Sequence, residues 1–102
     1  MTDIESALDA LFVNAEMIIR ELGNEFTSQN FLRKVIHDQQ HAYIDLLVAC
    51  QHLPFPFDQA HQKIGKRLSF LAPRLGYGPG EDKLKDTNIF RLPTESVVYR
   101  RN

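Results

Sequence analysis

Residues 58–71 of the 102-residue chain read DQAHQKIGKRLSFL. Ala60, Ile64, Leu68 and Leu71 recur every three or four positions, which predicts an amphipathic helix with one side against a core. We expect Asp58 to cap this helix and the helix to end before Pro73. The opposite side carries amide, basic and aromatic groups, at Gln59, Gln62, Lys63, Lys66, Arg67 and Phe70. The segment therefore predicts a helix with a basic stripe facing solvent.

The residues before this segment predict further helices. The first runs from about residue 3 to residue 22, with Thr2 and Glu5 as a capping box and Gly23 as its stop. The second starts near residue 28, and Thr27 can cap it. The sequence leaves open whether Asp38 begins a third helix or lies inside one long helix. Residues 52–57, HLPFPF, contain two prolines and predict a rigid connector with its phenylalanines against the core.

Residues 39–51 are apolar on two sides. Tyr43, Leu46 and Cys50 share one side of a helix, and Ile44 with Val48 forms a second. A helix that is apolar on two sides is usually buried between partners. We therefore expect this segment to be the central helix of the core.

The last thirty residues change in character. Glycines and a proline at positions 76–80 indicate a loop. Two β-prone runs, residues 88–92 (NIFRL) and 96–100 (SVVYR), flank a turn at residues 93–95, which predicts a hairpin. The fold class is therefore mainly α with a C-terminal β-hairpin (α+β), with about four helices in a single domain over residues 1–102.

The charges are distributed unevenly along a chain whose net charge is -1. Residues 1–62 hold three basic and nine acidic side chains, whereas residues 63–102 hold nine basic and four acidic ones. Such an asymmetry favours a surface that faces a polyanion. The alternative is that the two halves attract each other, within one molecule or between copies.

The helices, the basic helix 58–71 and the hairpin 88–101 together resemble a winged helix-turn-helix DNA-binding domain. The resemblance implies that the basic helix enters the major groove and that the hairpin, the wing, touches the adjacent backbone. Lys83 and Lys85 would lie on the approach to the wing. On this interpretation the protein is a small regulator or accessory subunit that binds duplex DNA. The contacting residues would be Gln59, Gln62, Lys63, Lys66, Arg67, Arg74, Lys83, Lys85, Arg91, Arg100 and Arg101.

A different class of function is a protein-interaction module or homodimer with no role in nucleic-acid binding. The long first helix would supply the contact. Its acidic side chains would meet a basic partner, such as the basic half of another copy; they are Asp3, Asp9, Glu16 and Glu21. The two hypotheses are compatible, because helix-turn-helix proteins commonly bind as symmetric dimers.

Other chemistry is not indicated by the sequence. His37 and His41 have a spacing that zinc can use, but no second paired motif accompanies them, so we expect no metal and no cofactor. No catalytic constellation is present, and we expect no enzyme. The longest apolar run, Leu46–Cys50, is too short for a membrane span, and the N-terminus has no signal pattern. With a single cysteine, these features predict a cytoplasmic protein.

Overall fold

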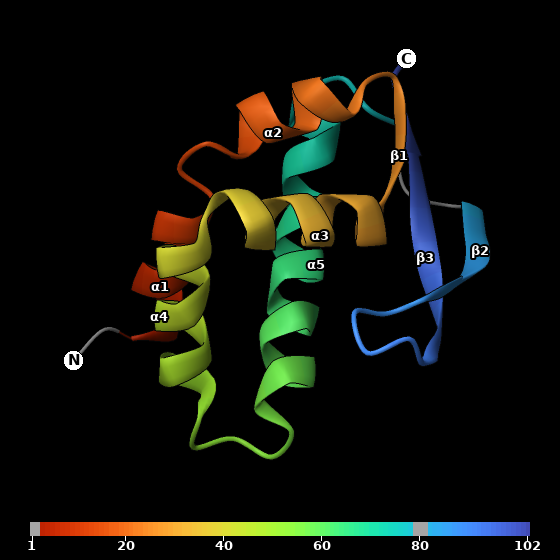
Figure 1. Cartoon of the computed structure of the whole chain (residues 1–102). Helices are drawn as coiled ribbons and strands as arrows, with labels where there is room; N and C mark the ends of the chain where they lie inside the picture. Colours follow the sequence, from red (N-terminus) through yellow and green to blue (C-terminus); the bar gives the residue numbers. More distant parts are fainter. Residues whose placement is uncertain (1–2, 79–81) are drawn as a thin grey trace.

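The computed structural model describes residues 3–78 and 82–102. Over these residues the chain forms five helices and a three-stranded antiparallel sheet, so the predicted α+β class is confirmed. The order is α1 (Ile4–Leu11), α2 (Ala15–Leu22), β1 (Glu25–Thr27), α3 (Ser28–Asp38), α4 (Gln40–Cys50), α5 (Pro56–Arg74), β2 (Asp82–Thr87) and β3 (Pro93–Arg100). The helices pack together on one side of the molecule, and the sheet lies along the other (Figure 1).

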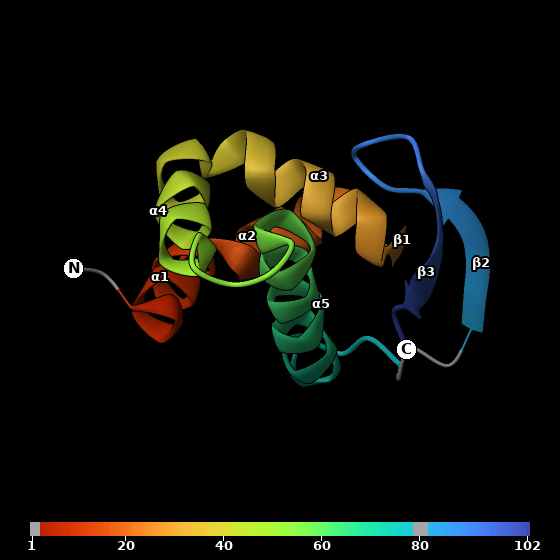
Figure 2. The ribbon, with the colours of Figure 1, turned by 90° about the horizontal axis from the view of Figure 1, so that it is seen from below.

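The core lies where α5 meets the other helices and the inner side of the sheet. Phe31, Leu46 and Ile64 are buried contributions of α3, α4 and α5. The sheet adds Phe26 and Tyr99, whose rings stack with centroids 5.4 Å apart. α5 and the sheet therefore share one hydrophobic core; Figure 2 shows their arrangement from below.

The prediction of one helix over residues 3–22 is wrong, because the chain turns between Leu11 and Ala15. Short-range bonds replace helical ones there: the N–H of Ala15 donates to the carbonyl of Phe12, at 3.0 Å. The apolar spacing continues across the turn because both helices face the same core. Asp3 caps α1 by accepting from the N–H of Ser6; the expected cap Thr2 lies outside the described residues. The stop at Gly23 is confirmed, with a φ of 95°.

The start of α3 is confirmed, and the open question at Asp38 is answered. Thr27 caps α3, and Oδ1 of Asn30 in turn accepts the N–H of Thr27. The helix then ends at Asp38, and a non-helical Gln39 (φ -125°, ψ 52°) separates it from α4. His37 and His41 therefore do not share one continuous helix.

Two expectations of burial are wrong. The second apolar side of α4 faces solvent, with Ile44 55% and Val48 53% exposed, whereas the side with Tyr43, Leu46 and Cys50 is buried. The connector does not tuck its phenylalanines into the core either, since Phe55 is 77% exposed and Phe57 is also exposed. Apolar composition alone does not tell which of two apolar helix faces finds a partner.

Helix α5 is longer than predicted at both ends. It starts at Pro56 rather than after Asp58, with Phe55 in a left-handed conformation before it, and the side chain of Asp58 makes no capping bond. Proline suits the first helical turn, where its missing N–H has no helical partner anyway. The helix continues through Pro73 to Arg74. The predicted core side is confirmed: Ala60, Ile64 and Leu68 are buried.

The hairpin is confirmed, and its second predicted strand, residues 96–100, lies within β3, but the first strand and the turn lie elsewhere than predicted. Residues 88–92 form the loop and not a strand, and Thr87 pairs with Pro93. Asn88 sets this loop, because its Oδ1 accepts the N–H groups of Phe90 and Leu92, while Arg91 takes a φ of 62°. Lys83 and Lys85 therefore lie within β2. The short strand β1 was not predicted; it pairs with β3, giving the order β1–β3–β2.

Candidate nucleic-acid interface

The outer surface of α5 carries most of the predicted contacts, and helical geometry divides them by direction. At 100° per residue, Lys63, Phe70 and Arg74 point to the side on which α1 lies. They line a groove there together with Lys66 and Arg67 of the same helix and with Glu5 and Leu8 of α1. Gln62 and Lys66 lie opposite the buried side and are exposed. The residues of the expected basic stripe therefore border one groove, and Lys66 also faces outward with Gln62.

Arg67 is held by acidic side chains of the same chain. Its guanidinium donates to Asp9 Oδ1 at 2.5 Å and to Glu5 Oε2 at 2.8 Å, and it lies over the ring of Phe12. These contacts tie α5 to α1 across 58 and 62 positions of sequence. Arg67 was expected to face a polyanion, but carboxylates of the same chain already neutralise its charge.

Arg100 is also paired inside the molecule. Its Nε donates to Glu25 Oε1 at 2.7 Å, and its Nη1 contacts Asp82. Arg100 thus joins the two outer strands, β1 and β2, across the central β3. The hydrogen bonds with Asp82 and Glu25 raise the pKa of Arg100, which keeps the guanidinium charged.

The other predicted cations form no ion pair within residues 3–78 and 82–102. Lys83 and Lys85 project from the edge strand β2, and Arg91 lies in the hairpin loop. Arg101 follows β3 at the opposite end of the sheet from this loop, where its N–H donates to the carbonyl of Asn24 (Figure 1). The hairpin cations therefore do not converge on one point.

An aromatic contact fixes the hairpin loop against the first turns of α5. The ring of Phe90 meets that of Phe57 edge to face at 5.4 Å and stacks on His61 at 6.5 Å. The hydroxyl of Tyr43 is 2.7 Å from Nε2 of His61, which links the same cluster to α4. The loop that carries Arg91 is thus docked beside the N-terminal half of α5.

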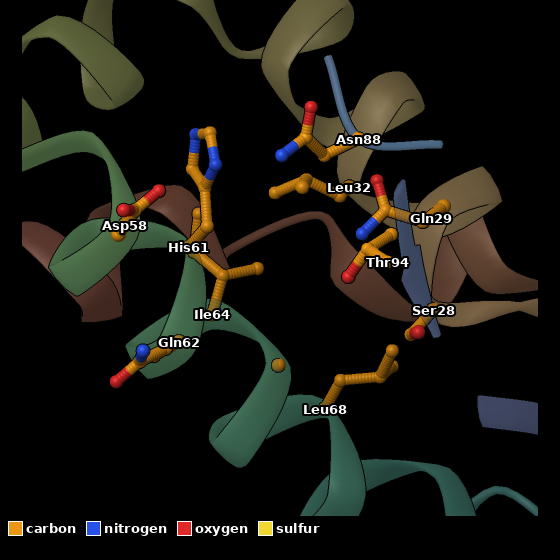
Figure 3. Close-up of a pocket in the computed structure, with 11 residues that line it drawn as sticks. Ser28, Gln29, Leu32, Asp58, His61, Gln62, Ile64, Leu68, Asn88 and Thr94 are labelled. Carbon is orange, nitrogen blue, oxygen red and sulfur yellow. The ribbon is translucent and has the colours of Figure 1, made fainter. Parts of the chain in front are cut away.

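A groove of about 230 Å³ lies between α3, α5 and the hairpin. Gln29, Leu32 and Asn88 approach it from one side, opposite His61 and Ile64 on α5 (Figure 3). Gly65 leaves open space on the α5 wall, since no atom lies within 4 Å of where its Cβ would be. Within the described part of the chain, Oε1 of Gln29 is buried and has no hydrogen-bond partner. The groove offers amide and hydroxyl groups and the carboxylate of Asp58 to a polar ligand, and its described lining residues include no lysine or arginine.

Two titratable groups of this cluster, His61 and Tyr43, have shifted pKa values. Burial lowers the pKa of His61 below its usual 6.5, and the charge of Asp58 opposes that shift in part. The ring shares a hydrogen bond with the hydroxyl of Tyr43, whose own pKa burial raises to about 12. The stacked cluster is therefore built around an uncharged imidazole.

This shift predicts a loss of stability as the pH falls below about 6.5. The unfolded chain then takes up a proton at His61 that the folded chain resists, so the free energy of unfolding decreases. Thermal unfolding followed by circular dichroism should show a lower Tm at about pH 5 than at about pH 7.5. His61→Phe keeps an aromatic ring and should flatten this difference; an unchanged difference would contradict the assignment. Asp38 and Asp86, whose pKa values lie below 3.8, act only at lower pH.

Sequence reasoning missed Gln29, Asn88 and the aromatic contacts of Phe57 and Phe90. The Asn88 position had a signal, because asparagine commonly bonds backbone groups two residues on and starts a turn. The contacts between Phe90 and α5 had no signal in the sequence, because they join segments about thirty positions apart.

The single cysteine lies in the core. Burial raises the pKa of the Cys50 thiol, which packs in the core. Within the described residues, no three histidine, cysteine, aspartate or glutamate side chains gather as a metal site would need. None of the helices over residues 3–78 and 82–102 combines the length and apolar character that crossing a membrane requires.

Comparison of the chain with protein-family models, with curated proteins and with solved structures finds no match.

Proposed function

We propose that the protein binds duplex DNA as a winged-helix-like domain, with α5 in the major groove and the β2–β3 hairpin as the wing. The proposal rests chiefly on one observation: the hairpin follows α5 in the chain and its loop packs on the first turns of α5. The sheet order supports it, because β1 pairs with β3 and anchors the hairpin beside α3. A helix and a fixed hairpin side by side can contact a groove and its flanking backbone together.

The exposed polar groups supply the chemistry. Gln62 and Lys66 point outward from α5, and glutamine and lysine both reach base edges and phosphates. Lys83, Lys85 and Arg91 are exposed on the hairpin and have no described ion-pair partner. Gln59, Lys63, Arg74 and Arg101 flank this surface. Arg67 and Arg100 take a structural role in the proposal, because each is bound by two carboxylates.

A salt series tests the proposal. A fluorescently labelled duplex of about 20 base pairs is titrated with the protein by anisotropy, between about 50 and 300 mM salt. The logarithm of the binding constant should fall linearly with the logarithm of salt, with a slope of about -0.9 for each phosphate contacted. Absence of binding at the lowest salt, or binding that salt does not change, would contradict the proposal.

Specificity gives a second readout of the same experiment. If Gln62 contacts base edges, Gln62→Ala should leave the salt slope unchanged and reduce the preference among duplex sequences by about 1–3 kcal/mol. A change in the salt slope without a change in sequence preference would show that Gln62 contacts the DNA backbone and not the bases.

A homodimer through the N-terminal helix is compatible with this role. Helix-turn-helix proteins that bind two half-sites do so as symmetric pairs. Helix α1 lies on the side of α5 away from the hairpin, so a contact there leaves the hairpin and Gln62 free, whereas Lys63, Lys66 and Arg74 border the groove between α1 and α5 (Figure 2).

A further inference from the structure

We propose that two copies of the chain associate reciprocally through two complementary surfaces on either side of α1. The first surface is an acidic groove between α1 and α4, and the second is a basic strip on α5. This inference does not require DNA binding, and neither surface includes Gln62 or the hairpin; Lys63 and Arg74 of the strip also flank the proposed DNA surface, and Lys66 lines the same groove.

The acidic groove has a volume of about 860 Å³. Its apolar part consists of Ile4, Val48 and Ala49, and Ile44 extends this apolar strip by one helical turn. Asp3, Glu5 and Asp45 also line it, and no lysine or arginine is among its described lining residues. Val48 and Ile44 are each more than half exposed, so the second apolar side of α4 has no covering element within the described chain.

The basic strip consists of Lys63, Phe70 and Arg74 on α5. Phe70 is 65% exposed and lies one helical turn from Arg74 and two from Lys63. The strip borders a groove of about 460 Å³ whose other wall is α1. An exposed phenylalanine between two cations is the chemical complement of an apolar groove with acidic walls.

Charge decides which surfaces meet. Two acidic grooves facing each other would bring carboxylates together, and two basic strips would bring cations together, so contacts between like surfaces are disfavoured. A groove of one copy against the strip of the other brings opposite charges together and buries Phe70 against Val48. Burial of exposed aromatic and aliphatic side chains then supplies the main driving force.

The positions of the two surfaces allow the contact to close. Glu5 of α1 lines both grooves, so the two surfaces flank the same helix. A two-fold axis near α1 therefore lets each copy offer its groove and its strip at once, and the assembly stops at two chains. Arg67 lies between the surfaces and keeps α1 in place through Glu5 and Asp9.

The test uses the full chain without DNA, in sedimentation velocity at about 50 and about 500 mM salt. Wild type should sediment as a dimer at low salt and dimerise more weakly at high salt, because salt screens the attraction between the acidic groove and the basic strip. Val48→Lys places a cation opposite the strip, and Phe70→Glu places an acid opposite the groove. Each variant alone should weaken the dimer at least about tenfold in dissociation constant. Circular dichroism checks that both variants fold, as is expected for exposed positions.

Mixing the two variants is the decisive measurement. An equimolar mixture of Val48→Lys and Phe70→Glu should form a heterodimer, because one contact is native and the other joins Lys to Glu. Met17→Lys on α2 is the matched control: Met17 is 54% exposed and lines neither surface, so the dimer should persist.

Three outcomes would overturn the inference. The first is a wild type that stays monomeric at low salt and at about 0.1 mM protein, where even weak dimers populate. The second is a Phe70→Glu variant that dimerises as well as wild type. The third is a mixture of variants that stays monomeric. Each of these results leaves the DNA proposal standing, since no DNA enters the experiment.

Discussion

Tyr77→Ala is expected to lower the free energy of unfolding by about 3–5 kcal/mol, as other large aromatic-to-alanine changes in cores do. Tyr77 is only 2% exposed and follows α5 directly. Its ring meets Phe26 of β1 edge to face at 5.2 Å, and its hydroxyl donates to the carbonyl of Gly23 at 2.6 Å. The side chain thus joins the end of α5 to the end of α2 and to the sheet. A loss of this size is a large part of the stability of a small domain.

Urea unfolding followed by circular dichroism measures this change. Tyr77→Phe keeps the ring and removes the hydrogen bond to Gly23, so it should cost only about 1–3 kcal/mol, because the Gly23 carbonyl loses its partner. The ordering of the two variants separates packing from hydrogen bonding. If Tyr77→Ala cost less than about 1 kcal/mol, the join between α5 and the sheet would not be a main support of the fold.

The parts of the fold that depend on residues close together in the sequence could be predicted. The buried side of α5 follows from spacing at Ala60, Ile64 and Leu68, and the start of α3 follows from the hydroxyl of Thr27. The turn at residues 12–14 could not be predicted in this way. It keeps the apolar spacing of one helix, and Phe12 leaves the helix to pack on Phe31, at a centroid distance of 5.6 Å.

The strands were harder to predict, because the more apolar of two neighbouring segments forms the loop and the more polar one forms a strand. Residues 88–92 are more apolar than residues 82–87, yet the second set forms β2. The bonds that Asn88 makes within the loop outweigh the β-propensity of Ile89 and Phe90. β1 has only three residues, which is too short for a periodic signal.

The candidate site shows the same division between local and distant effects. The sequence correctly indicates a cationic outer side of α5, because helical spacing is local. It cannot tell that Arg67 meets Glu5 and Asp9, or that Arg100 meets Glu25 and Asp82, because those pairs form only after distant segments pack. Charge counting along the chain therefore overstates the positive surface that remains for a polyanion.

The largest functional effect is expected for the triple variant Lys66→Gln, Lys83→Gln and Lys85→Gln. If α5 and the hairpin hold DNA as proposed, this variant loses three phosphate contacts. The salt slope should then become shallower by about 3, and affinity at about 100 mM salt should drop on the order of a hundredfold. The anisotropy titration of the wild type measures both quantities. The three side chains are exposed, so the Tm should stay within a few degrees of wild type.

Two controls distinguish a DNA surface from a general loss of positive charge. Arg20→Gln removes an exposed cation from α2 and should leave the salt slope unchanged. Arg67→Gln with Glu5→Gln removes one charge of each sign at an internal ion pair and should also leave the slope unchanged. If the Arg67 pair variant flattens the slope as much per residue as the lysine variant does, Arg67 exchanges its carboxylates for phosphate on binding. If the lysine variant binds like wild type, α5 and the hairpin are not the DNA surface, because exposed cations in contact with phosphates cannot be removed without a change in salt dependence.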